Sequence, residues 1–226
     1  MRLIIVAAGQ GFKLDGFNKL LMRDPRTREP LLARYQRLFA GWPVTVVVGY
    51  QAIRIMDEFP ELDYVYNDQW SITGNSYSLS LALDERPAVA LSSDLFFDEA
   101  MVELLVQAPA DAVMVRRSEN KQAHSIRCRV EAGLVRALYL GEPQRPEDLE
   151  TTGIYKISDP GLLRGWKRAC AENRSVFAGI NLPIAEREVT AVDIRDAFFH
   201  EVNTHLDYLS LIRLRREQPG PEGRSR

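Results

Sequence analysis

The sequence predicts a single-domain α/β fold built on a doubly wound, mostly parallel sheet. Short apolar runs at 3–6, 44–50, 88–91 and 112–115 do not alternate with polar residues. Such runs are typical of strands buried on both faces of a parallel sheet. Helical patterns separate them at regular intervals, which indicates βαβ units. No repeat or linker divides the 226 residues, so we expect one domain over 1–217.

The first half of the chain alternates strands and helices. A polar, glycine-containing loop follows the first strand and extends to Pro30, which fits the first turn of a helix over 31–39. Trp42 and Pro43 end that helix before the second strand. The pattern then predicts a helix at 51–58, a strand at 63–66, and helices at 75–83 and 99–107.

The second half is predicted to be more antiparallel. Segments 125–130 and 134–140 flank Glu-Ala-Gly and predict a hairpin, followed by a surface loop at 141–148. Further elements are expected as a helix at 162–171, a strand at 189–194 and a last helix at 204–217. In the last helix, the residues expected to face inward are Leu206, Leu209 and Ile212, with Leu211 as a further candidate. The residues expected to face solvent are Arg213, Arg215 and Arg216. The tail 218–226 is predicted to be disordered.

Composition argues against several functional classes. The chain has 29 Lys and Arg against 31 Asp and Glu, so nothing predicts a nucleic-acid partner. Cys128 and Cys170 lie far apart, which argues against a disulfide framework or a cysteine zinc site. No apolar stretch approaches the ~20 residues that span a bilayer. We therefore expect a cytoplasmic protein with no membrane partner.

A glycine loop follows the first strand. Segment 8–11 is Ala-Gly-Gln-Gly, and two close glycines let backbone N–H groups approach a phosphate or a base. It matches neither a Walker loop nor the Rossmann dinucleotide fingerprint. Lys13 and Lys19 add positive charge beside it. A plain tight turn with two solvated lysines is the alternative.

Oxygen ligands follow two other predicted elements. Asp94 comes directly after strand 88–91, at the edge where open α/β sheets bind ligands, and suits Mg²⁺. The alternative role is an N-cap for the next helix, which Asp98 fits better. Glu201, Asn203 and Asp207 also carry oxygens of the kind that Mg²⁺ accepts. The alternative is that Asn203 or Thr204 simply caps the last helix.

The loop over 66–79 mixes aromatic, amide and hydroxyl side chains before a helix N-terminus. Gly74 and Asn75 would bring a backbone and an amide group near a ligand, and the helix end favours an anion. A capped surface loop is the alternative. The histidines His124, His200 and His205 have no metal-ligand spacing.

Segment 4–21 resembles the AAGxGxR…PKxLL signature of the nucleotidyltransferase superfamily, whose members make nucleotide-activated sugars and alcohols. Lys13 stands where that family usually has arginine, and Asn18 where it usually has proline. Asp94 matches the family's metal aspartate, and Asn203 its second metal ligand. Segment 149–155 is similar to the family's acceptor-contacting E-x-N-T-G-I segment, with threonine in place of the asparagine.

Within the superfamily, Val-Gly-Tyr at 48–50 and the 66–79 loop resemble the bacterial phosphocholine cytidylyltransferases. The resemblance implies a Rossmann-like fold with a mixed sheet of the nucleotidyltransferase type. It also implies transfer of CMP from CTP, or of a nucleotidyl group from another NTP, to a small phosphorylated acceptor, with Mg²⁺ as cofactor and pyrophosphate as product. A sugar-1-phosphate nucleotidyltransferase and a non-catalytic nucleotide-binding protein are the alternatives, and a molybdenum-cofactor nucleotidyltransferase is a more distant one.

The same resemblance implies a role for individual residues. It implies catalytic roles for Lys19, Lys13 and Asp94, and Mg²⁺ held by Asp94 and Asn203. The nucleotide site would comprise Ala8, Gly9, Gln10, Gly11, Gly74, Asn75 and Ser93. The acceptor site would comprise Trp70, Glu150, Tyr155, Phe199 and Glu201, because a quaternary ammonium is bound by aromatic faces and carboxylates. The oligomeric state is left open.

Overall fold

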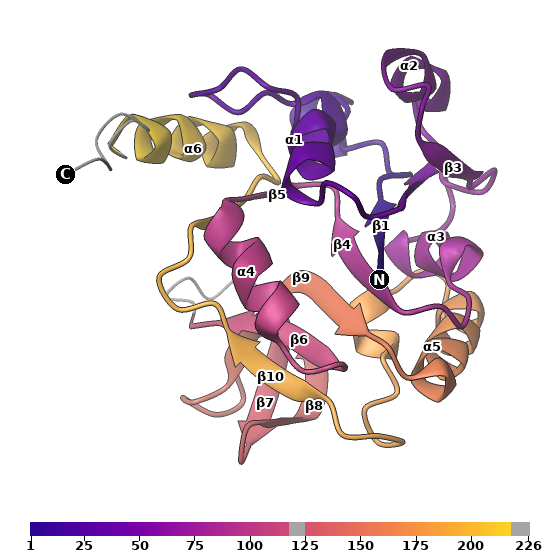
Figure 1. Ribbon diagram of the computed structural model, residues 1–226, viewed down its shortest axis with the longest axis vertical. Coiled ribbons are helices and arrows are strands. Elements are labelled where there is room, and N and C mark those ends of the chain that lie inside the picture. Colours follow the sequence, from indigo (N-terminus) through magenta and orange to yellow (C-terminus); the bar gives the residue numbers. More distant parts are fainter. Residues whose placement is uncertain (118–124, 218–226) are drawn as a thin grey trace.

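A computed structural model describes residues 1–117 and 125–217 and shows a mixed α/β fold (Figure 1). The predicted disordered tail and His124 lie outside the described residues. The strands are β1 (Arg2–Val6), β2 (Val44–Val48), β3 (Asp63–Tyr66), β4 (Ala88–Ser92), β5 (Leu95–Phe97), β6 (Ala112–Arg116), β7 (Ile126–Glu131), β8 (Leu134–Leu140), β9 (Leu149–Ile157), β10 (Thr190–Asp193) and β11 (Phe199–Glu201). The helices are α1 (Leu31–Leu38), α2 (Ala52–Glu58), α3 (Asn75–Ala82), α4 (Glu99–Gln107), α5 (Pro160–Glu172) and α6 (His205–Glu217), with short 3₁₀ turns η1 (Phe12–Leu14), η2 (Lys19–Leu21) and η3 (Ala178–Asn181).

Nine strands form one sheet in the order β3-β2-β1-β4-β9-β6-β10-β8-β7. Parallel pairing joins β3, β2, β1 and β4, and again β6 and β10. Between these two groups, β9 runs antiparallel to both β4 and β6. The doubly wound α/β fold is confirmed, and the sheet is mixed, with its parallel pairs concentrated in the first half of the chain.

The two faces of the sheet carry separate cores. Leu3 and Ile5 of β1 pack with apolar residues of α1, α2 and α4, whereas Ile4 faces α3 and α5. This division follows the two-residue period of a strand, which sends alternate side chains to opposite faces. All of these core side chains are buried, which explains why the first strands read as continuous apolar runs.

The last helix turns a different face inward from the one predicted. Leu206 and Leu209 are 73% and 50% exposed, whereas Leu211 and Arg215 are buried. The predicted inward position of Leu206 and Leu209 and the predicted exposure of Arg215 are therefore wrong. Arg215 is buried because it forms ion pairs with Asp24 and Asp98, at 3.0 Å and 2.8 Å.

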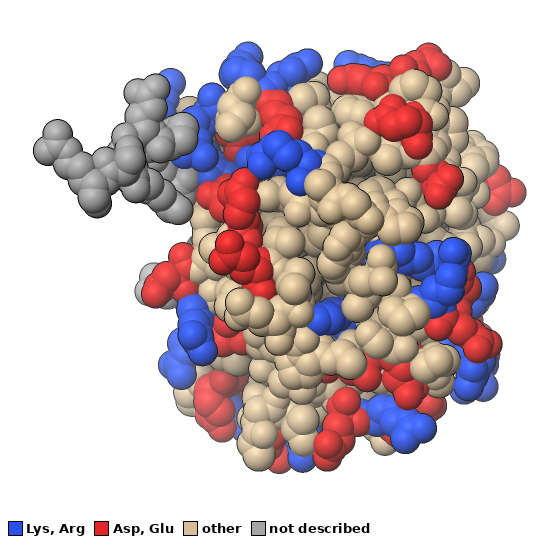
Figure 2. Space-filling view, viewed as in Figure 1, with Lys and Arg blue, Asp and Glu red and all other residues tan. Residues whose placement is uncertain are grey.

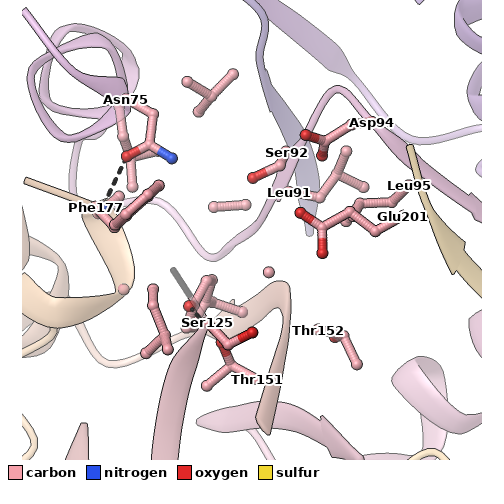
Figure 3. A pocket seen from close by; sticks show the side chains of 18 of the residues that line it. Asn75, Leu91, Ser92, Asp94, Leu95, Ser125, Thr151, Thr152, Phe177 and Glu201 are labelled. Carbon is pink, nitrogen blue, oxygen red and sulfur yellow. Dashed lines mark hydrogen bonds between the residues drawn. The ribbon is translucent and has the colours of Figure 1, made fainter. Parts of the chain in front are cut away.

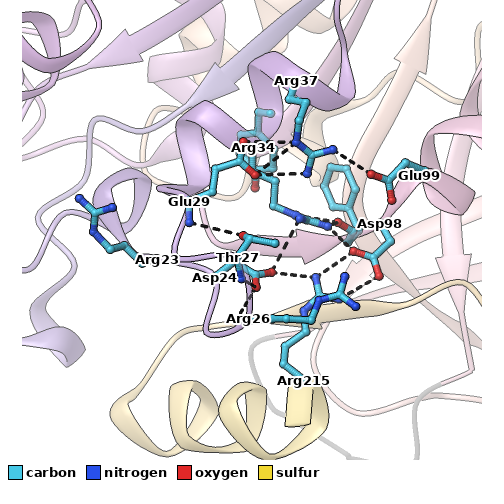
Figure 4. A network of polar contacts seen from close by, with 12 residues as sticks. Arg23, Asp24, Arg26, Thr27, Glu29, Arg34, Arg37, Asp98, Glu99 and Arg215 are labelled. Atoms are coloured by element: carbon cyan, nitrogen blue, oxygen red, sulfur yellow. Dashed lines mark hydrogen bonds and ion pairs between the residues drawn. The ribbon is translucent and has the colours of Figure 1, made fainter. Parts of the chain in front are cut away.

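These ion pairs belong to a buried network that also includes Arg34 of α1 (Figure 4). Arg34 pairs with Asp98 and donates to the carbonyl oxygen of Phe97 at 2.7 Å and 3.1 Å. Asp98 occupies the N-cap position of α4, as predicted, but its carboxylate accepts hydrogen bonds from the two arginines and none from the first turn of α4. The network ties α6 to α1 and to the start of α4.

The charged surface is mixed. On the face shown in Figure 2, acidic and basic side chains are interspersed, in keeping with the net charge of −2. Among residues 1–117 and 125–217, no helix combines the length and the apolar character needed to cross a bilayer.

Candidate active site

The candidate site lies where β1 and β4 end at the same edge of the sheet. Val6 and Ser92 are register partners in these parallel strands, so the glycine loop and Asp94 leave the sheet side by side. The short strand β11 pairs with β5, and the N–H of Val202 donates to the carbonyl oxygen of Asp94 at 2.9 Å. This pairing brings the segment that carries Asn203 against Asp94, about a hundred residues earlier in the chain.

Lys19 joins the two segments. Its Nζ donates to Oδ2 of Asp94 at 2.8 Å and to Oδ1 of Asn203 at 2.9 Å. Asn18 holds the lysine in place, because its side chain accepts from the N–H of Leu20 at 3.1 Å and so caps η2. Asn18, at the position where the family that the chain resembles usually has proline, thus has a local structural role as the cap of η2.

Two compartments meet at Asp94. The glycine-loop compartment is lined by residues that include Ala8, Gly9, Gly11, Lys19, Trp70, Gly74 and Ser93. The β9 compartment, shown in Figure 3, is lined by residues that include Ser125, Glu150, Thr151, Thr152, Tyr155, Phe177, Glu201 and Asn203. Val6, Asn75, Ser92 and Asp94 line both. The site can thus hold two ligands that meet beside Asp94 and Lys19.

Of the seven residues that the sequence assigned to the nucleotide, all but Gln10 line the glycine-loop compartment. Lys13, which was assigned a catalytic role, is an exposed residue of η1 and lines neither compartment. Trp70, predicted for the acceptor, lies instead in the glycine-loop compartment, with its ring centroid 5.3 Å from that of Tyr50. The structure therefore separates Trp70 from the other predicted acceptor residues.

The predicted aromatic cage is not assembled in the β9 compartment. Phe199 does not line this compartment. The guanidinium of Arg116 lies over the ring of Phe199, 4.8 Å from the ring centroid. Tyr155 does line it, but the ring packs edge-on against Trp166 and the hydroxyl lies 3.3 Å from that of Thr151. Phe177 supplies an aromatic side chain that sequence reasoning missed, because no pattern marked the segment 176–188.

Glu150 lines the same compartment, but its carboxylate is already paired. Arg116 contacts one oxygen at 3.1 Å and Arg127 contacts the other at 3.4 Å. Arg127 and Glu150 are both buried. Glu150 is therefore neutralised by neighbouring cations, whereas Glu201 is the carboxylate that faces the cavity beside Asp94 (Figure 3).

Asn75 connects the two compartments through its side chain. Its Oδ1 accepts a hydrogen bond from the N–H of Ala178 at 2.9 Å, which fastens η3 to the N-terminus of α3 (Figure 3). Asp207, a candidate metal ligand, has a different role. Its Oδ2 accepts from the N–H groups of Asn203 and Thr204, at 3.0 Å and 2.7 Å, and so organises the start of α6.

The electrostatics of the site suit a divalent cation. Burial, together with the charge of Asp94, raises the pKa of Glu201 to about 7. Oδ1 of Asp94 is buried and accepts no hydrogen bond from residues 1–117 or 125–217. A cation between the two carboxylates would relieve their repulsion and use this unpaired oxygen. Within the described ranges no three His, Cys, Asp or Glu side chains form a metal cluster. The donors that fit Mg²⁺ are the carboxylate of Asp94 and the amide oxygen of Asn203, and Glu201 lies beside Asn203 as a further negative charge.

Gly49 is predicted to be essential for the shape of the glycine-loop compartment. A Cβ there would lie 2.6 Å from Cβ of Trp70 and 2.7 Å from the carbonyl oxygen of Ala8. We expect Gly49→Ala to lower the free energy of unfolding by ~1–3 kcal/mol in urea titrations, because both neighbours must shift. Gly9→Ala is the control, since a Cβ at Gly9 meets nothing within 4 Å. Equal stability of the two variants would contradict this packing argument.

No family model and no curated protein sequence matches the chain. Several solved structures do resemble it. CTP:phosphocholine cytidylyltransferase from Streptococcus pneumoniae has a TM-score of 0.75 at 15% identity, covering 94% of this chain and 98% of that one. Inositol-1-phosphate CTP transferase from T. maritima has a TM-score of 0.72 at 16% identity, covering 97% of both chains. A Bacillus anthracis protein described as a thymidylyltransferase candidate for glucose 1-phosphate has a TM-score of 0.73 at 16% identity, again over 97% of both. Over nearly its whole length, the chain has the fold of the nucleotidyltransferases.

Proposed function

We propose that this protein is a Mg²⁺-dependent nucleotidyltransferase that transfers CMP from CTP to a small phosphorylated alcohol or phosphonate of the phosphocholine type and releases pyrophosphate. The observation that carries the proposal is the Lys19–Asp94–Asn203 cluster at the junction of two compartments. A transfer reaction needs two ligands whose reacting ends meet beside fixed charges, and this arrangement provides both.

In the proposed reaction, a phosphate oxygen of the acceptor attacks the α-phosphorus of CTP in line, and the bond to pyrophosphate breaks. No protein nucleophile is required, because such transfers depend on positioning and charge neutralisation. Lys19 would stabilise the charge on the α-phosphate, with Lys13 approaching from solvent. Asp94 and Asn203 would hold Mg²⁺, which would supply further charge neutralisation on the reacting phosphates.

The compartments suggest where each ligand binds. The backbone of Ala8, Gly9 and Gly11, together with Gly74 and Ser93, lines the compartment that we assign to CTP. We assign the β9 compartment to the acceptor, with Glu201 as the carboxylate for a cationic head group. Asn75 lines both compartments and would contact both ligands.

A sugar-1-phosphate acceptor is the second candidate, and one observation favours it. The β9 compartment presents the hydroxyl-bearing side chains of Ser125, Thr151, Thr152 and Tyr155, whereas Trp70 and Phe199 are absent from it. Hydroxyl side chains are suited to binding the hydroxyl groups of a sugar. In either case the nucleotidyl transfer and the Lys19–Asp94–Asn203 cluster are the same.

The test is pyrophosphate release with Mg²⁺, using each of the four NTPs against phosphocholine, phosphoethanolamine, 2-aminoethylphosphonate and several sugar 1-phosphates. We expect turnover with CTP and an amino-alcohol phosphate or phosphonate. Turnover confined to sugar 1-phosphates would replace the proposed acceptor by the second candidate. No release with any pair, in a protein that still binds CTP, would favour a non-catalytic nucleotide-binding protein.

Glu201→Gln distinguishes the two acceptor classes. Glutamine keeps an oxygen that can accept the 2.7 Å hydrogen bond from Nδ2 of Asn203, but it removes the charge. For a cationic acceptor we expect KM to rise by roughly tenfold, a loss of ~1.4 kcal/mol, with a smaller change in KM for CTP. Steady-state kinetics with each substrate varied in turn measures both. Equal effects on the two KM values would contradict the assignment of Glu201 to the acceptor.

A further inference from the structure

A separate groove lies between the loop that carries Lys19, the start of α2 and the start of α6. It has a volume of about 820 Å³, within the range of ~300–1,000 Å³ that is usual for small-molecule sites. None of the residues that line it lines either compartment of the candidate active site. The groove is therefore a second cavity, and the proposed reaction does not use it.

Part of the groove's lining is apolar. Leu14, Leu21 and Met22 form buried parts of its wall, and Phe17 and Leu209 line it while remaining 43% and 50% exposed. Leu209 is one of the residues wrongly predicted to pack inside. Its apolar side chain instead faces a groove large enough for the apolar part of a ligand.

The groove is also lined by cations that lack acidic partners. Arg23, Arg28 and Arg54 line it, and none of them takes part in an ion pair formed within residues 1–117 and 125–217. The guanidinium of Arg23 donates to the carbonyl oxygen of Arg28 at 2.8 Å. Among the described lining residues Asp15 alone is acidic, and its Oδ2 lies 3.3 Å from Nε2 of His205. The charge that complements this groove is negative.

The backbone around the groove is unusual. Asp15, Arg28 and Gln51 all line it and have φ angles of 51°, 61° and 54°. They are three of the five non-glycine residues with positive φ in the described part of the chain. Left-handed conformations cost such residues ~1–2 kcal/mol each, and strain of this kind gathers at ligand sites. The strain supports a groove shaped for binding.

The walls of the groove continue into the candidate active site. Leu14 and Phe17 precede Lys19 in the same loop, and α6 begins at His205, two residues after Asn203. A ligand in the groove would contact both segments that meet in the 2.9 Å hydrogen bond between Lys19 and Asn203. The groove therefore adjoins both segments that make this contact.

We propose that this groove is an effector site for a small organic anion with an apolar body and a single phosphate, sulfate or carboxylate group. The arginines bind the anionic group, and the leucine, methionine and phenylalanine side chains bind the apolar body. Binding at the groove changes the affinity of the active site for its nucleotide. Only this coupling rests on the proposed function; the binding itself does not.

The first test measures binding of octyl phosphate by calorimetry, below its aggregation concentration and without nucleotide. We expect one saturable site, with inorganic phosphate and the neutral octyl glucoside at least tenfold weaker. Arg54→Glu and Leu209→Asp should each weaken binding by about tenfold, or ~1.4 kcal/mol, and both residues are exposed, so folding is unaffected. The matched control is Arg136→Glu, an exposed arginine outside the groove, which should leave binding unchanged.

The second test measures the affinity for CTP with and without saturating octyl phosphate. A change of at least about threefold is expected, and linkage requires CTP to change the affinity for octyl phosphate by the same factor. The absence of saturable binding, or binding insensitive to both groove variants, would overturn the site. The surface would be assigned to a membrane if the protein binds phosphatidylglycerol vesicles but not monomeric octyl phosphate, and if Arg54→Glu abolishes the vesicle binding.

An unchanged affinity for CTP would overturn the coupling between the groove and the active site. Failure to bind CTP at all would refute the proposed function and leave the groove measurement intact.

Discussion

Replacing Asp94 by alanine is expected to lower the rate of pyrophosphate release at least ~100-fold, the scale of losing one fixed charge partner of a transition state. Asp94 lines both compartments, and no donor in the described part of the chain contacts its Oδ1. Lys19→Ala should have an effect of the same size, because its ammonium is within 3 Å of both Asp94 and Asn203. Assays at saturating CTP and acceptor measure the loss directly.

Two other lysines provide controls for this experiment. Lys167→Ala removes an exposed lysine of α5 far along the chain and should leave the rate unchanged. Lys13→Ala tests the other lysine of the glycine loop, and we expect a smaller effect than for Lys19→Ala because Lys13 lines neither compartment. Near-normal turnover of folded Asp94→Ala or Lys19→Ala would refute the assigned roles, as would an equal loss in Lys167→Ala.

The first half of the fold could be predicted because its strands are uninterrupted apolar runs. The apolar runs predicted at 3–6, 88–91 and 112–115 lie within β1, β4 and β6, and the helix over Glu99–Gln107 has the predicted bounds. Strand β9 was not predicted, since its buried sequence contains Glu150, two threonines and Gly153, which break the apolar pattern. The short strand β5 was missed as well, because its three residues are too few to show a period.

The positions of site residues could be predicted from the sequence where a residue directly follows the end of a strand. Asp94 and the glycine loop follow neighbouring parallel strands, so the edge of the sheet brings them together. The positions of Phe199, Trp70 and Phe177 depend instead on tertiary contacts between distant segments, such as the pairing of β11 with β5. The spacing of residues along the chain carries no information on such contacts.

The wrong prediction of the buried face of α6 also results from contacts between distant segments. A helical pattern of leucines predicts an inward apolar stripe, but the ion pairs of Arg215 with Asp24 and Asp98 determine which face is buried. The partners are 117 and 191 positions away along the chain, so nothing local identifies the arginine as buried. The leucines left outside line the groove or face solvent.

Arg215→Ala is expected to lower the free energy of unfolding by ~3–5 kcal/mol, because it leaves the buried carboxylate of Asp24 without its close cation and removes one of the two arginines that pair with Asp98. Asp24 and Arg215 have fully buried side chains, and Arg34 lies 3.8 Å from Asp24, too far to replace the 3.0 Å contact. Urea unfolding followed by circular dichroism measures the change. The neighbouring, exposed Arg216 is the matched control, and Arg216→Ala should change stability by less than ~0.5 kcal/mol.

The pH dependence gives this prediction a second test. Burial alone would raise the pKa of Asp98, but its hydrogen bonds and charge interactions with Arg215, and then the charge of Arg34, outweigh burial and lower it. A lowered pKa stabilises the fold above the ordinary carboxyl pKa of ~4, and this contribution is lost as the pH falls through the folded-state value. Without Arg215 the pKa of Asp98 rises, so Arg215→Ala should unfold at a higher pH than the wild type. If the wild type and Arg215→Ala unfold at the same acidic pH, Arg215 does not supply this pH-dependent part of the stability.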